Sequence, residues 1–406
     1  MTDTATTLPL VETNTVNAAT EGWSAKTKLA LGSLAVSTFA LVFTEFLPAG
    51  LLTPMAANLG ISQGTAGQAV TATAIAGTLS GLLVGTAIGR TDRKLVLLVL
   101  SALAILSNIA ATLAPSFVVL VLARVIIGIA VGGYWSLAGA VVARIVSVEA
   151  IGKGMAIILV GVSLATISAA PLAALIAEYA GWRMAFALGI ALASFALLAQ
   201  LFALPRLPAS ESVRLGVMFG LLRRPMLQIA LIAILAVAGG HFAGYTYVRP
   251  VLEGYTHMAP MRIAEVLLAF GIANFLGNLV AGMVVDRWLG PSLTLTGLLL
   301  GAAALTLLAF GAGPLAAAGS VILWGFAFGA APLVLQTWTV RATPDHIEAS
   351  GGLLVAAFQI AIASGAAIGG LIVDHASVTD VLIFTGVVAL GAAFLPLIRV
   401  KAAVIA

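Results

Sequence analysis

Three ionisable residues, Glu45, Arg124 and His241, lie inside long runs of apolar residues. A charge inside a bilayer is costly, so such residues mark a functional site by default. At the rise of an α-helix, Glu45 and Arg124 both sit roughly 10 Å inside the same membrane boundary, where they could pair. A carboxylate whose arginine moves away can load or release a proton, and histidine titrates near neutral pH. Alternatively, the pair is a permanent clamp and His241 is a hydrogen-bond donor.

Other residues could shape a solute site around these three. Pro48 follows Glu45 within one turn and predicts a bend that could open a path to the acid. Aromatic side chains with polar tips, together with amides, can bind a polar organic ligand. These candidates are Tyr134, Trp135, Tyr245, Tyr247, Trp324, Gln336 and Gln359. The aromatic ones could equally be lipid-facing or interfacial.

Two short charged loops complete the set of candidate residues. The first holds Arg90, Asp92, Arg93 and Lys94, and the second holds Asp286 and Arg287. Loops this short can pin neighbouring helix ends through ion pairs, and we interpret them as a gate. The alternative is that their charges only set the topology.

Membrane helices must position all of these residues. Hydrophobic residues make up 61% of the chain and charged residues 8%, against about 25% charged in a soluble domain. The apolar residues form twelve blocks near the length of a membrane-spanning helix, without the alternation of strands. The predicted spans are 29–52, 66–88, 95–114, 117–140, 153–178, 184–204, 227–249, 263–285, 292–311, 314–338, 350–373 and 379–398.

The spans fall into two similar halves. We predict a disordered tail (1–26), a six-helix bundle (27–204), a polar linker (205–225), a second six-helix bundle (226–399) and a short C-terminal segment (400–406). Gly128 and Gly132 recur 197 residues later as Gly325 and Gly329. The segment 168–178 likewise matches 364–374. Two parallel repeats around an axis normal to the membrane are a transporter architecture.

Charge and missing motifs limit the function further. Most lysines and arginines outside the spans fall on the side of the two termini, which predicts cytoplasmic termini in the inner membrane. The tail lacks the features of a signal peptide. A phosphate-binding loop, the HExxH and GxSxG motifs, a metal-ligand set and cysteines are all missing. We therefore expect no enzyme, metal, cofactor or nucleic-acid partner.

Several segments resemble the major facilitator superfamily, in particular its twelve-span drug:proton antiporters. Within that branch the chain is similar to bacterial sugar-efflux and purine-ribonucleoside-efflux permeases. The likeness covers about residues 28–399 and is carried by 44–62, 123–140, 170–186 and 240–250. Arg124 and Gly128 match the family's RxxxG pattern in span 4, and Arg90, Arg93 and Lys94 match its first charged loop. Gly89 and Asp92 depart from that loop.

The resemblance implies a secondary transporter in which the two halves rock around a solute site lined by spans 1, 4, 7 and 10. It implies proton-driven efflux of a small organic solute such as a purine nucleoside, a sugar or a drug, by a monomer. The span-5 antiporter motif keeps Pro171, a candidate hinge, but has alanine at 170 where glycine is usual. An uptake symporter or facilitator therefore stays open, as does a membrane sensor that transports nothing.

Overall fold

The computed structural model describes residues 23–89, 91–147, 150–208 and 215–397. The predicted tail lies almost entirely outside the described residues, as do 400–406, part of the predicted linker and Arg90. The described residues form helices and no strands. The described part of the chain is therefore all-helical, as its apolar blocks predict.

Twelve of the described helices are long and apolar enough to cross a membrane, which confirms the predicted spans. Those of the first half are α1 (Ala25–Leu59), α2 (Gln63–Ala87), α3 (Arg93–Thr112), α4 (Phe117–Ile145), α5 (Ile151–Ala180) and α6 (Trp182–Ala203). Those of the second half are α8 (Pro225–Tyr245), α10 (Pro260–Val284), α11 (Leu289–Phe310), α12 (Pro314–Ala342), α13 (Ile347–His375) and α14 (Asp380–Ala393). Shorter helices are α7 (Leu215–Leu221), α9 (Val248–Gly254) and η3 (Leu395–Leu397).

The seventh predicted span, 227–249, differs from the structure. It is divided into α8, which ends at Tyr245, and the short helix α9, which begins at Val248. Pro250 has no N–H with which to reach the carbonyl of Thr246, so a continuous helix would lose a bond at this point. At the end of α8 the Thr246 hydroxyl donates to the Phe242 carbonyl at 2.6 Å. After the break, α9, which carries Arg249 and Glu253, lies at one end of the bundle.

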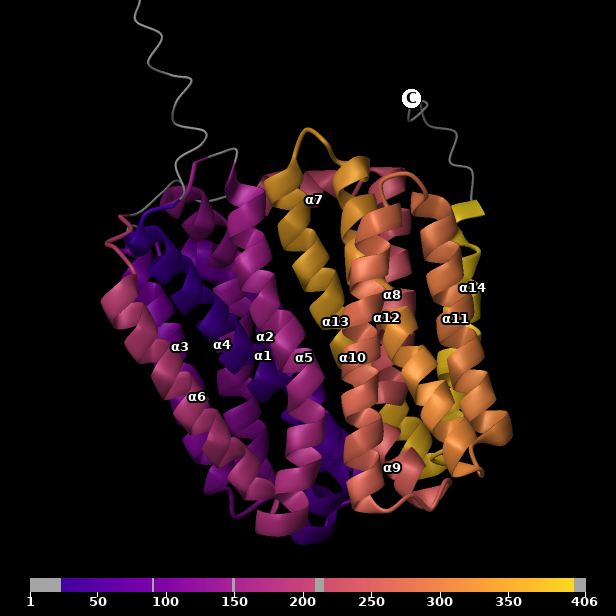
Figure 1. Ribbon diagram of the computed structural model, residues 1–406. Helices are drawn as coiled ribbons and strands as arrows, with labels where there is room; N and C mark the ends of the chain where they lie inside the picture. Colours follow the sequence, from indigo (N-terminus) through magenta and orange to yellow (C-terminus); the bar gives the residue numbers. More distant parts are fainter. Residues whose placement is uncertain (1–22, 90, 148–149, 209–214, 398–406) are drawn as a thin grey trace, which may run out of the picture.

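The two halves stand side by side, with α1 to α6 on the left of Figure 1 and α8 to α14 on the right. Helix α7 lies at one end of the bundle and α9 at the other, and we name the two ends after these helices (Figure 1). Helix α2 packs against α4 in the first half, as α10 packs against α12 in the second. Between the halves, α2 packs against α13 and α5 against α10. The helix pairing therefore repeats, as the duplicated sequence predicts.

The repeated glycines mark the closest helix contacts. A Cβ atom at Gly132 of α4 would collide with the backbone carbonyl of Gly77 in α2. A Cβ atom at Gly329 of α12 would collide in the same way with the carbonyl of Asn274 in α10. Gly77 and Asn274 are themselves 197 residues apart. The repeat thus preserves the position of each contact and the glycine of α4 or α12 that makes it, because only small residues let membrane helices approach this closely.

Replacing Gly132 with valine should separate α2 from α4. The added side chain meets backbone, which cannot turn aside, so we expect a loss of about 3 kcal/mol or more of stability. Gly139→Val is the matched control, because that glycine lies on the same helix with no atom within 4 Å of an added Cβ. Monodisperse protein recovered after size-exclusion chromatography in detergent measures the effect. Equal recovery of the two variants would refute the close contact.

Candidate functional site

The site begins at a proline in α1. Pro48 has no N–H, so the carbonyl of Thr44, four residues earlier, loses its helical donor. Arg124 of α4 supplies the missing bond: Nη1 donates to the Thr44 carbonyl at 2.8 Å and Nη2 donates to the Glu45 carbonyl at 2.9 Å. The arginine side chain is fully buried. Arg124 therefore fixes the segment of α1 that carries Glu45.

The expected ion pair between Glu45 and Arg124 is not formed in this structure. Among the described residues, no nitrogen of Arg124 lies within 4.0 Å of the Glu45 carboxylate. Glu45 and Arg124 do lie at one level of the bundle, since Arg124 donates to the Glu45 carbonyl. The guanidinium instead binds backbone carbonyls, because Pro48 leaves an acceptor that must be satisfied inside the protein.

The carboxylate of Glu45 faces the second half of the molecule. Gln359 of α13 donates from Nε2 to Glu45 Oε1 at a long 3.4 Å. Glu45 is 7% exposed and Gln359 is 4% exposed. The single oxygen of this amide, Gln359 Oε1, is buried and accepts no hydrogen bond from any described residue. An acidic group and a spare acceptor thus meet where the two halves join.

His241 lies within the second half, in a cage of rings from α8, α10 and α12. The Trp324 indole donates to His241 Nδ1 at 2.9 Å. Because Nδ1 accepts this bond, the imidazole is neutral in this structure and its other nitrogen carries the proton. Phe328 stacks on the imidazole with ring centres 3.3 Å apart, and Tyr245 lies on it at 5.0 Å. His241 therefore accepts a hydrogen bond through Nδ1. The alternative considered in the sequence analysis, in which His241 serves as a hydrogen-bond donor, is not what this contact shows.

Residues absent from the sequence candidates connect these two groups. Phe46, next to Glu45, stacks on Phe242, next to His241, with ring centres 6.1 Å apart. Phe270 of α10 extends the cage by stacking on Tyr245 at 4.7 Å. The only sequence signal for Phe46 and Phe242 was their position directly after the candidate acid and histidine. Glu45, Gln359, His241, Tyr245 and Trp324 thus form one neighbourhood that spans both halves.

The remaining candidates lie elsewhere. Tyr134 is buried within the first half, where its hydroxyl contacts Thr38 at 2.8 Å and the Leu34 carbonyl at 2.8 Å. Trp135 is half-buried and Gln336 is exposed. The Tyr247 hydroxyl donates to the Ala366 carbonyl at 2.8 Å. Of the seven predicted solute ligands, the structure therefore places three, Gln359, Tyr245 and Trp324, in the region of Glu45 and His241.

Pro171, the second predicted hinge, is buried inside α5. Its missing N–H leaves the Ile167 carbonyl without a helical donor. Gly271 of α10 packs closely against Ile167 at this place. The proline therefore lies near the contact between the two halves.

The charged loops of the predicted gate contact their own halves. Asp92 caps α3 by accepting from the Lys94 N–H at 2.8 Å, and it also accepts from the Leu207 N–H at 3.1 Å. The Lys94 ammonium donates to the Leu201 and Leu204 carbonyls. Arg93 donates to the Gly89 and Thr91 carbonyls.

The second loop is arranged similarly. Asp286 Oδ1 lies 3.5 Å from Arg341 Nη2 of the same half. The guanidinium carbon of Arg287 lies over the Trp288 ring, 5.6 Å from its centre. Arg90 lies outside the described residues. The contacts described here tie helix ends together within one half, and Asp286 alone does so through an ion pair. A gate between the halves stays a prediction.

An ion pair also joins the start of α8 to the loop before α13. Arg224 donates to both oxygens of Asp345 at 2.6 Å, which raises the pKa of Arg224 and lowers the pKa of Asp345 from 3.8 to about 2. Because the pKa of Asp345 is lower in the folded state, its ionised form stabilises the fold fully above pH 3.8, and this stabilisation is lost as the pH falls through about 2.

Between these pH values the unfolding temperature of the native chain should therefore fall more than that of Asp345→Asn. The difference should be small, because the side chains are 37% and 51% exposed. Thermal unfolding in detergent at several acidic pH values measures it. Parallel curves for the two proteins would show that the pair contributes nothing to stability.

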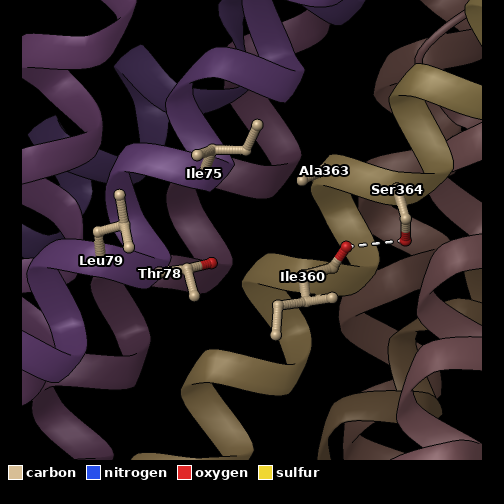
Figure 2. Close-up of a pocket in the computed structure, with 6 residues that line it drawn as sticks. All are labelled: Ile75, Thr78, Leu79, Ile360, Ala363 and Ser364. Atoms are coloured by element: carbon tan, nitrogen blue, oxygen red, sulfur yellow. Dashed lines mark hydrogen bonds between the residues drawn. The ribbon is translucent and has the colours of Figure 1, made fainter.

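A cleft of about 270 Å³ opens beside the Glu45 region, between α2 and α13 (Figure 2). Its six lining residues are Ile75, Thr78, Leu79, Ile360, Ala363 and Ser364. The Ser364 hydroxyl donates to the Ile360 carbonyl at 2.8 Å and so adds no free polar group (Figure 2). Ile75, Leu79 and Ile360 are about half exposed, as expected for side chains facing lipid. This cleft is a lateral groove rather than the candidate solute site.

Comparison with known proteins places the chain among transporters. The family model described as Major Facilitator Superfamily matches residues 34–351. The purine ribonucleoside efflux pump NepI of Shigella sonnei is 36% identical over 372 residues, which cover 92% of this chain and 94% of that protein. NepI of Escherichia coli is 35% identical over the same shares. A crystal structure of a D-xylose–proton symporter has the same fold, with a TM-score of 0.69 at 18% identity over 91% of this chain and 96% of the other.

Proposed function

The chain belongs to the Major Facilitator Superfamily, and from that premise we propose that it exports a purine ribonucleoside, or a solute of similar chemistry, in exchange for protons. The chain is a multi-pass membrane transporter and not an enzyme. The choice of solute is supported by relatives that are named as purine ribonucleoside efflux pumps and match over 92% of this chain. The single observation that carries the proton coupling is the buried carboxylate of Glu45 at the junction of the two halves.

The neighbourhood of Glu45 suits a purine nucleoside chemically. A purine base has a flat aromatic face and several hydrogen-bonding edges. The rings around His241 stack on one another in this structure, and they would supply stacking surfaces for the base once the halves move apart. Gln359 Oε1 offers a buried acceptor for a base N–H or a ribose hydroxyl. We therefore assign Gln359, Tyr245, Trp324 and His241 to solute binding and Glu45 to proton exchange.

A transport cycle follows from this assignment. Proton and solute compete for the region between the halves, so that arrival of one favours departure of the other. We place the α7 end in the cytoplasm, as the distribution of lysine and arginine predicts. Rocking of the halves would expose the site at the two ends in turn, with the charged loops closing the α7 end in the other state. The two-half design needs no second copy, so we propose a monomer in the inner membrane.

Uptake into inverted membrane vesicles tests the proposal. With an imposed proton gradient, vesicles that contain the protein should accumulate labelled inosine or adenosine, and an uncoupler should abolish the accumulation. Uridine, xylose and a cationic dye serve as comparison solutes. Equilibration without dependence on the gradient would indicate a facilitator. Gradient-driven movement in the opposite direction would indicate a symporter, and no transport of any solute would favour a sensor.

A further inference from the structure

A second proline in α1 repeats the arrangement at Pro48, but with a partner from the other half of the molecule. Pro54 has no N–H, so the carbonyl of Gly50, four residues earlier, lacks its helical donor. Arg249 of α9 donates from Nη1 to this carbonyl. Its Nε donates to Glu253 Oε1 at 2.7 Å, which holds the guanidinium in place. Arg249 is 4% exposed, so this is a buried bond between the two halves.

The two arginines differ in what happens when the halves move. Arg124 and the Thr44 carbonyl belong to the same half, so their bond survives a rocking movement. Arg249 and Gly50 belong to different halves, so their bond must break when the α9 end opens. When that bond breaks, the buried guanidinium of Arg249 must find water or another acceptor, and leaving it without one costs free energy. This cost opposes opening, so the contact helps to determine how often the α9 end opens.

A second polar contact between the halves lies at the same end. Asp374 of α13 accepts from the Ser62 hydroxyl at 2.6 Å and from the Gly64 N–H at 2.9 Å, both at the start of α2. A carboxylate at a helix N-terminus is favourably placed against the helix dipole. The described contacts of the charged loops at the α7 end stay within one half. The structure is thus held together across its halves at the α9 end.

We propose that Arg249 is a positioning residue of the transport cycle, which keeps the α9 end closed by binding the backbone carbonyl that Pro54 leaves free. Glu253 orients the guanidinium for this bond. The proposal rests on the transporter function proposed above. Its consequence is that restoring the missing N–H, by Pro54→Ala, should weaken the closure although Arg249 is still present.

The chain contains no cysteine, so one introduced thiol reports on one place. Ala56 of α1 is 4% exposed and packs in the same apolar cluster as Val248 and Val251 of α9. We would place Ala56→Cys in the full chain in lipid nanodiscs and measure its rate of alkylation by a water-soluble maleimide. This experiment needs neither solute nor proton gradient, so its failure is separate from failure of the proposed function.

Arg249→Ala and Pro54→Ala should each raise the alkylation rate at least about tenfold, because both remove the bond that favours the closed state. The double variant should react no faster than either single variant, since the two changes break one contact. Arg262→Ala is the matched control, because Arg262 is exposed and pairs with Glu265 on its own helix. It should leave the rate unchanged.

A second reporter separates gate opening from general loosening of the fold. Thr343 is buried where α12 ends, on the α7 side of the bundle. A cysteine introduced there by Thr343→Cys should be alkylated slowly in the native chain and in each variant. Faster alkylation at both positions would reduce Arg249 to a structural role and overturn the proposal. Rates at Ala56→Cys that are the same in Arg249→Ala, Pro54→Ala and Arg262→Ala would overturn it as well.

Discussion

Replacing Glu45 with glutamine should abolish the accumulation of nucleoside driven by a proton gradient. Glutamine keeps the size of the side chain and can still accept from Gln359, but it cannot carry a proton between the two sides. The variant should therefore still bind solute and exchange labelled for unlabelled solute across the membrane. Gradient-driven uptake into inverted vesicles should fall to the level of vesicles without the protein, a larger effect than we expect from any other single change.

The matched control is Glu178→Gln. Glu178 is an exposed carboxylate near the end of α5, so its replacement removes the same charge without touching the junction of the halves. It should leave gradient-driven uptake unchanged. Persistent coupled transport by Glu45→Gln would remove Glu45 from the coupling mechanism. Loss of exchange as well as of coupling would instead make it a residue for solute binding or folding.

Replacing Arg124 with leucine should cost stability because the Thr44 carbonyl, which has no helical donor, then loses the bond from Arg124 inside the bundle, and the Glu45 carbonyl loses a second donor. A buried acceptor left without a partner costs about 1–3 kcal/mol, so we expect a loss of about 2 kcal/mol for the Thr44 carbonyl. Thermal unfolding of the purified protein in detergent measures this loss. The result would establish that Arg124 satisfies the backbone of α1.

The cause of this effect can be tested by a second change. Pro48→Ala restores an N–H that can bond to the Thr44 carbonyl along the helix. In the Arg124→Leu background it should therefore recover part of the lost stability, whereas in the native background it should change little. A double-mutant cycle compares the four proteins. Strictly additive effects would mean that the arginine does not serve the carbonyl that the proline leaves free.

The sequence was sufficient for the architecture because the bilayer imposes it. Each span must be a helix of about 20 apolar residues, so the block lengths alone predict where helices lie. The repeat could be predicted from Gly128 and Gly132 because close packing in lipid demands small residues at fixed places. The division of 227–249 into α8 and α9 was missed, although Pro250 was a visible reason for it.

The site could be predicted only to its depth in the membrane. Helical rise placed Glu45 and Arg124 at one level, but it could not distinguish the carboxylate from the backbone carbonyls within the same turn. Pro48 was the relevant signal in the sequence, because its missing N–H leaves the Thr44 carbonyl free to accept from Arg124. The contact of Gln359 with Glu45 depends on which face α13 turns toward α1, and neither helix has an amphipathic stripe strong enough to reveal it.

Proton release on solute binding tests the coupling most directly. Inosine would be added to the purified protein in a weakly buffered solution, and the pH change would be recorded together with the amount of solute bound. If solute and proton compete through Glu45, binding should release protons from the native protein and none from Glu45→Gln, although the variant still binds. Solute binding by the native protein without proton release, or equal release by both proteins, would contradict the account.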